Sequence, residues 1–272
     1  MLTFYGDTSG QEGDERRLVV TGGYLGHEKQ WERWESEWSR TLREFGVSTF
    51  HATDFNTSHG EFKGWDAPKK IAFSRLITAI TEARLEHGYA YGVRCDDEYQ
   101  AAMAPVLQEF ENLHDKFTAK MFSIIVLLAK VAIHPRPAGE KIAVVFEQEA
   151  GTGEAIEWLN YRRSKREVWL VSAFTGFATM SKKEGVWLQS ADLLAHEAWR
   201  AGCEYLDPVG RPERKSLARL GMRDRLHVGT AKPDGLRIGA AKLAEFLKDA
   251  PGGWHSRSVY PLEHRLPPEA FR

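Results

Sequence analysis

The chain has 272 residues, of which 42% are hydrophobic and 28% charged, so it can bury one large core or two small ones. Its 37 Lys and Arg residues are balanced by 38 Asp and Glu residues, which excludes the basic excess of a protein that simply coats nucleic acid. The two cysteines, Cys95 and Cys203, exclude a disulfide-dense secreted scaffold and a zinc site built from cysteines alone. A reducing cytoplasm is therefore the expected compartment.

No segment has the pattern of a signal peptide or a membrane span. Asp7 interrupts the stretch in which a signal peptide needs an apolar run. The most apolar segment, Met121–Ala129, lies between Lys120 and Lys130 and is far shorter than the roughly 20 residues needed to span a bilayer. We interpret it as a buried helix and expect no membrane association.

The first part of the chain predicts a β-hairpin and then a helix. Residues 2–6 form an apolar strand that leads into Asp7, and residues 17–25 form a second strand after a polar turn. Residues 27–45 have helical periodicity. The face of this helix that packs on the core carries Trp31, Trp34, Trp38 and Leu42.

Strands and helices alternate along the rest of the chain. Short strands are predicted at residues 47–50 and 89–93, and a loop at 56–64. A helix is predicted to begin at residues 66–68, capped by Asp66 or its neighbours, and to end near residue 86. Further helices are predicted at residues 96–107, 112–133, 189–205 and 236–247, and after the Gly151-Thr152-Gly153 turn. The run at 142–146 predicts a strand buried on both faces, residues 167–180 one or two strands, and the end beyond 250 a loop. This alternation is typical of the α/β class.

Three acidic residues stand at comparable places in this pattern. Asp7 and Glu147 end apolar strands, and Asp192 lies near the start of an amphipathic helix. Strand ends in an α/β sheet meet at one rim, where ligands usually bind. Carboxylates gathered there repel one another unless a cation neutralises them, and hard oxygen ligands suit Mg²⁺ or Mn²⁺. One or two such ions are expected, because a pair can activate water and stabilise the leaving oxygen in phosphodiester cleavage.

Several short motifs resemble one family. Asp7-Thr8-Ser9-Gly10 resembles the Asp-x-Ser-Gly opening of the bacterial and phage proteins catalogued as domain of unknown function 3800. Phe50-His51-Ala52-Thr53-Asp54 resembles that family's Phe-His-Ala-x-Asp run. The segment Leu188–Ala195 resembles its Gln-x-Ala-Asp-Leu run, and Ser181-Lys182 fits the approach to it. The three motifs occur in the family's order.

The resemblance implies an RNase H-like core, with a mixed sheet flanked by helices and with acids on the first strand, a later strand and a closing helix. It covers residues 1–206, so residues 207–272 are expected to be a C-terminal extension that packs on the same domain. Asp7 and Asp192 match the first and last acidic positions. Glu147 or Glu149 supplies the later one, and we expect both to point to the same strand face. Thr8 replaces the more usual acidic neighbour.

The auxiliary candidates have two interpretations each. His51 would relay a proton, activate water or bond the backbone, and Asp54 would be an outer metal ligand or the N-cap of a following turn. Lys183 or Lys182 would meet a phosphate or remain solvated, and Gln189 would orient a ligand or cap its helix. The substrate-binding candidates are Ser9, Lys182, Gln189, Arg162 and Arg163.

Basic segments indicate how nucleic acid would bind. Residues 211–242 hold nine Lys and Arg residues against three acids, and residues 162–166 form a second cluster. Such clusters suit a phosphate backbone, although ordinary solvated surface has the same composition. The chain lacks a P-loop, a Gly-x-Ser-x-Gly nucleophile motif and a His-Glu-x-x-His zinc motif.

The sequence thus predicts a metal-dependent nuclease that acts on DNA or RNA. The alternatives are a noncatalytic nucleic-acid-binding or phage-defence partner protein with a vestigial site, and a hydrolase of nucleotides or other phosphates. The oligomeric state, including a homo-oligomer, stays open.

Overall fold

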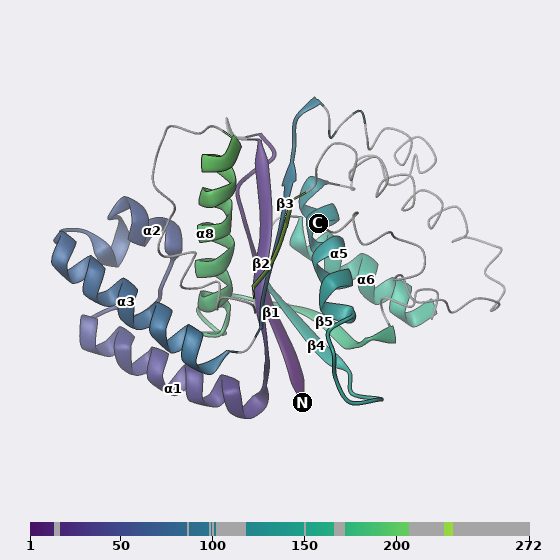
Figure 1. Ribbon diagram of the computed structural model, residues 1–272, viewed down its shortest axis with the longest axis horizontal. Helices are drawn as coiled ribbons and strands as arrows, with labels where there is room; N and C mark the ends of the chain where they lie inside the picture. The colour runs from purple at the N-terminus through teal and green to yellow at the C-terminus, as the bar shows by residue number, and fades with distance from the viewer. Residues whose placement is uncertain are drawn as a thin grey trace.

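A six-stranded sheet in the order β5-β4-β1-β2-β3-β6 runs through the middle of the computed structural model (Figure 1). The strands are β1 (Leu2–Ser9), β2 (Leu18–His27), β3 (His87–Arg94), β4 (Ile142–Glu147), β5 (Phe174–Met180) and β6 (Leu226–Thr230). β1, β2 and β3 form an antiparallel meander, β4 runs parallel to β1 and β5, and β6 runs parallel to β3. The sheet is therefore mixed, and the predicted α/β class and the first hairpin are confirmed.

The structure describes residues 1–13, 17–85, 87–97, 99, 101, 118–149, 151–165, 172–206 and 226–230. For residues 161, 162, 164, 165, 205, 206 and 226–230 it describes the backbone only. The predicted helices at 96–107 and 236–247, the first part of that at 112–133 and the loop beyond 250 lie largely or wholly outside these ranges.

Helices cover both faces of the sheet (Figure 1). One face carries α1 (Glu28–Phe45), α2 (Ala52–Thr57), α3 (Ala67–Arg84) and α8 (Leu188–Leu206), and the other carries α5 (Ala119–Ala132) and α6 (Thr152–Lys165). A single 3-10 turn at Gly60–Phe62 follows α2. None of the described helices is both long and apolar enough to cross a membrane.

The two largest of three hydrophobic cores in the described residues lie on opposite faces of the sheet. Between the sheet and α5, the side chains of Phe4, Val144 and Phe146 pack with those of the apolar helix. On the opposite face, Trp34 and Trp38 of α1 are fully buried in an aromatic core. The predicted tryptophan face of α1 is confirmed, because Trp31, Trp34, Trp38 and Leu42 are all buried.

The helix ends follow the local sequence. Asp66 caps α3, since its Oδ1 accepts a hydrogen bond from the backbone N–H of Lys69 at 2.8 Å, as predicted. α1 ends at Gly46, whose φ of 73° lies in the left-handed region that favours glycine.

Three sequence predictions differ from the structure. Residues 47–50 form no strand, because Phe50 is buried in the aromatic core and the chain turns directly into α2. The predicted loop at 56–64 contains the end of α2 and the 3-10 turn. β4 is not equally buried on both faces, since its residues alternate between buried and partly exposed.

The C-terminal extension contributes an unpredicted strand. β6 pairs with β3 from Gly88↔Leu226 to Gly92↔Thr230. This part of the extension therefore belongs to the same sheet as the core domain.

Candidate functional site

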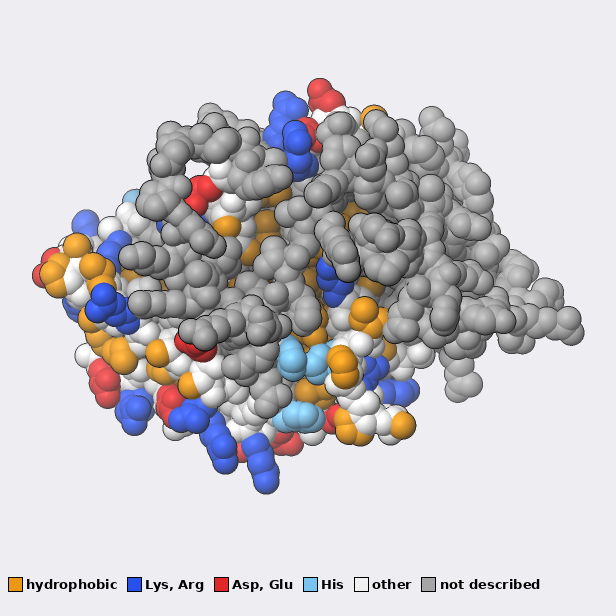
Figure 2. Space-filling model, viewed as in Figure 1, with side chains coloured by type: hydrophobic (Ala, Val, Ile, Leu, Met, Phe, Trp, Pro, Cys, Tyr) orange, Lys and Arg blue, Asp and Glu red, His pale blue; other side chains and the backbone are white. Residues whose placement is uncertain are grey.

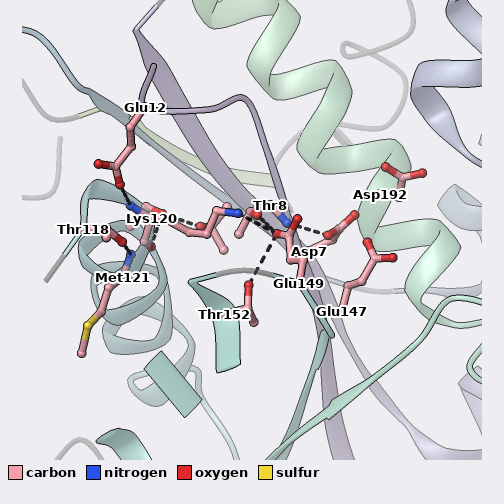
Figure 3. A network of polar contacts seen from close by, with 12 residues as sticks. Asp7, Thr8, Glu12, Thr118, Lys120, Met121, Glu147, Glu149, Thr152 and Asp192 are labelled. Carbon is pink, nitrogen blue, oxygen red and sulfur yellow. Dashed lines mark hydrogen bonds and ion pairs between the residues drawn. The ribbon is translucent and has the colours of Figure 1, made fainter. Parts of the chain in front are cut away.

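Three carboxylates that are far apart in the sequence converge at one end of the sheet. Asp7 lies on β1, Glu147 is the last residue of the neighbouring strand β4, and Asp192 lies in the first turns of α8. Figure 3 shows the carboxyl groups of Glu147 and Asp192 on the same side of Asp7. The predicted grouping of these three acids is therefore present in the fold.

A glycine on β2 allows α8 to come close enough to complete the group. Gly22 pairs directly with Asp7 in the β1–β2 register. A Cβ atom at Gly22 would lie 2.9 Å from the backbone N and 3.0 Å from the Cα of Ala195 on α8. Ala195 follows Asp192 by three residues, about one helical turn. The missing side chain at Gly22 thus sets the separation between the helix and the strand that carry two of the acids.

The ammonium group of Lys182 occupies the centre of the three carboxylates. Its Nζ lies 2.5 Å from Glu147 Oε2, 3.1 Å from Asp7 Oδ2 and 3.3 Å from Asp192 Oδ1. The Lys182 side chain is only 9% exposed. Burial alone would lower the pKa of Lys182, but the charges of Asp192, Asp7 and Glu147 outweigh it and raise the pKa, so the side chain is a cation.

One ammonium does not neutralise three carboxylates. Burial raises the pKa of Asp7 well above its usual range, Lys182 opposes this, and the charges of Asp192, Glu147 and Glu149 raise the pKa further. Asp7 Oδ1 accepts a hydrogen bond from the backbone N–H of Thr8 at 2.7 Å. Asp7 Oδ2 is buried and accepts no well-aligned hydrogen bond from the described residues, although it faces Lys182 Nζ. The site therefore has unmet capacity for positive charge.

Asp192 is oriented from the side opposite Lys182. Its Oδ2 accepts a hydrogen bond from the backbone N–H of Ala52 at 2.7 Å, at the start of α2. Gln189, one turn earlier on α8, accepts hydrogen bonds at its Oε1 from Trp38 Nε1 at 2.9 Å and from the backbone N–H of Phe50 at 3.1 Å. Gln189 therefore fixes the segment before α2 against α8, a positioning role in place of the predicted ligand or cap role.

Glu149 does not share the position of Glu147. Its Oε1 lies 3.2 Å from Lys120 Nζ of α5 and accepts hydrogen bonds from the hydroxyls of Thr8 and Thr152. Figure 3 shows this cluster on the opposite side of Asp7 from Glu147 and Asp192. The expectation that both glutamates point to one strand face is wrong, because β4 ends at Glu147 and the strand alternation ends with it.

His51 and Asp54 form a pair beside the site. His51 stands at the N-terminal boundary of α2, next to Ala52, and its Nδ1 lies 3.5 Å from Asp54 Oδ2. Both side chains are partly exposed, at 43% and 44%. Asp54 lies inside the first turn of α2, whose N-cap is His51, so Asp54 does not cap this helix, and its Oδ2 faces His51.

The remaining candidates are dispersed. Ser9 is the partly buried last residue of β1, and Lys183 is exposed beside Lys182. Arg163 is exposed on α6 and donates from Nη1 to the carbonyl of Thr175 at 2.6 Å, which places it against the edge strand β5. The side chain of Arg162 and the basic residues at 211–225 and 232–242 lie outside the described part of the chain.

Sequence reasoning missed two features of the site. Lys182 was predicted to meet substrate, yet its side chain lies among the acids; only its place just before the α8 motif indicated proximity. The backbone N–H of Ala52 was missed because an amide bond to a distant carboxylate leaves no mark in side-chain patterns.

Comparison of the chain with protein-family models, curated proteins and solved structures finds no match. Within the described ranges, no three His, Cys, Asp or Glu side chains are arranged as a ready set of metal ligands. The site is therefore defined by its own geometry, in which the acids surround a lysine.

Proposed function

We propose that the chain is a metal-dependent phosphodiester hydrolase, a nuclease, with an RNase H-like core related to the domain of unknown function 3800 family. The observation that carries the proposal is the convergence of Asp7, Glu147 and Asp192 on one cationic point. The resemblance implies acids on a first strand, a later strand and a closing helix of a mixed sheet. β1, β4 and α8 supply acids from these places.

The chemistry of the three acids suits Mg²⁺ or Mn²⁺. All their donor atoms are hard carboxylate oxygens. Within the described residues Asp7 Oδ2 accepts no well-aligned hydrogen bond, and three acidic side chains face a single ammonium group. Asp7, Glu147 and Asp192 would hold the ion. When bound, it would stabilise negative charge on a phosphate oxygen and make a water more acidic.

The chain's own groups would then position the substrate and move a proton. His51 directly precedes Ala52, whose N–H binds Asp192, and its Nδ1 faces Asp54 Oδ2 at 3.5 Å. It would accept the proton of the attacking water. The exposed Lys183, adjacent to the central lysine, would contact a phosphate of the substrate.

The support that charge gives to a nucleic-acid substrate comes from the basic clusters in the sequence, at residues 162–166 and 211–242. On the face in Figure 2, Lys and Arg side chains mix with Asp and Glu side chains over α1 and α3, so the described surface there is not a basic patch. The basic residues of 211–242 therefore remain the proposed phosphate-binding segment.

The test is a cleavage assay with and without a divalent cation. Wild-type protein with Mn²⁺ is incubated with labelled single- and double-stranded DNA and RNA, and with free nucleotides in a parallel arm. We expect cleavage of at least one polymer, lost on chelation and in Asp192→Asn. Cleavage that survives chelation would contradict the metal dependence. Retention of polymer with bound Mn²⁺ and no product would contradict the hydrolase proposal, and phosphate release from nucleotides alone would favour the alternative substrate class.

The two glutamates at the end of β4 should respond differently to amide substitution. Because Glu147 faces Asp7 and Asp192 through Lys182 whereas Glu149 binds Thr8, Glu147→Gln is expected to lose roughly tenfold more Mn²⁺ affinity than Glu149→Gln. Calorimetric titration of the two isosteric variants measures this difference. Equal losses, or a larger loss in Glu149→Gln, would move the metal site to the other side of Asp7.

A further inference from the structure

Lys182 is placed as a resident cation of the site, not as a surface contact for substrate. Its single Nζ faces all three carboxylates at 2.5–3.3 Å, within a side chain that is 9% exposed. Carboxylate oxygens bind Mg²⁺ at about 2.0–2.1 Å. An ion held by these three acids would need the space that the ammonium now fills, and two cations that close would repel each other strongly.

A turn holds the backbone around Lys182, whereas the charge of Lys182 lies at the end of a flexible side chain. Lys182 lies in the connection between β5 and α8, not on a helix or strand. A turn closes this connection: the N–H of Gly185 donates to the carbonyl of Ser181 at 2.9 Å, and the Ser181 hydroxyl donates to Glu184 at 2.8 Å. A lysine carries its charge on a flexible four-carbon stem. Rotation of that stem alone would move the charge without rebuilding the turn.

We propose that Lys182 is an internal counterion that a divalent metal ion must displace from Asp7, Glu147 and Asp192, and that the displaced ammonium then meets the substrate phosphate. This inference rests on the proposed function, because it assumes that the acids bind a metal. Lys182 thus keeps the metal-free site folded and lowers its metal affinity. If the ammonium occupies the site for more than about 90% of the time, the apparent affinity falls at least about tenfold.

The first test compares Mn²⁺ affinity in wild type and three matched variants, measured by calorimetry without substrate. Lys182→Met removes the central charge and keeps an unbranched stem. Lys120→Met removes a nearby charge that faces Glu149, and Lys183→Met removes the exposed neighbour. We expect about tenfold or more tightening in Lys182→Met and much smaller changes in the other two. If Lys120→Met increased Mn²⁺ affinity as much as Lys182→Met, the loss of any nearby positive charge would explain the increase, and the proposal would be overturned.

A second measurement uses wild-type protein, so it holds even if Lys182→Met does not fold. Acetylation by a water-soluble active ester, read by mass spectrometry, is followed at Lys182 and Lys183. Saturating Mn²⁺ is expected to speed acetylation of Lys182 several-fold and leave Lys183 unchanged.

The outcomes separate the two proposals. Mn²⁺ binding with unchanged Lys182 acetylation, or with unchanged or weaker affinity in Lys182→Met, overturns the counterion role and leaves the nuclease proposal standing. Failure of every variant and of wild type to bind Mn²⁺ overturns the metal-dependent function and the counterion role together.

Discussion

Asp7→Asn is expected to lower the rate of metal-dependent cleavage by at least about 100-fold, the size of effect seen when one group that stabilises a transition state is removed. Asp7 is 1% exposed, and its Oδ2 faces the cation at the centre of the site. The substitution keeps the side-chain shape and the oxygen that accepts from the Thr8 N–H. It removes one charge and one donor oxygen for the metal.

The same variant should not lose stability in metal-free buffer. Because burial and the neighbouring carboxylates raise the pKa of Asp7, its ionised form at neutral pH lowers the stability of the fold relative to a neutral side chain. The melting temperature of Asp7→Asn is therefore expected to equal or exceed that of wild type, whereas Mn²⁺ should stabilise only wild type. Full activity in this variant, or a large fall in its metal-free melting temperature, would contradict the assigned role.

Trp38→Ala is expected to destabilise the protein by about 3–5 kcal/mol, the usual cost of deleting a buried aromatic side chain. Trp38 is fully buried, stacks on Trp34 with ring centroids 4.5 Å apart and contacts Phe50 edge-on at 5.7 Å. Its Nε1 donates to Gln189 Oε1 at 2.9 Å. Urea denaturation measures the change.

Trp38→Phe separates packing from the hydrogen bond. It keeps a ring in the aromatic core and removes the donor to Gln189, so it should cost about 1–3 kcal/mol. Because Gln189 lies one turn before Asp192, this milder variant should also lower cleavage while the protein stays folded. If Trp38→Ala and Trp38→Phe lost the same stability, the aromatic ring would contribute little packing energy. That result would contradict the prediction made from the full burial of Trp38.

Much of the fold could be predicted from residue patterns, for physical reasons. The tryptophan spacing of α1 and the cap at Asp66 are local signals, and both are confirmed. The strand predicted at 47–50 was wrong. The apolar Phe50 suggested a strand, but it is buried because it packs against aromatic residues that are distant in the sequence. β6 was missed because its pairing with β3 depends on residues more than 130 positions away.

The three acids of the candidate site could be predicted from the sequence, but the lysine among them could not. The end of β4 and the start of α8 indicated where Glu147 and Asp192 lie, because sheet geometry brings such positions together. Asp7 was expected at a strand end but lies inside β1, which continues to Ser9. Glu149 was misplaced because the alternation of β4 ends at Glu147. The place of the Lys182 ammonium depends on side-chain rotamers and on the charges around it, which no sequence spacing encodes.

The most direct test of the account is equilibrium binding of Mn²⁺ to wild type and to Asp7→Asn/Asp192→Asn. Wild type is expected to bind one or two ions, whereas the double variant, still folded by circular dichroism, is expected to bind none at the same concentration. Unchanged Mn²⁺ binding in the double variant would show that these acids do not form a metal site and would contradict the account.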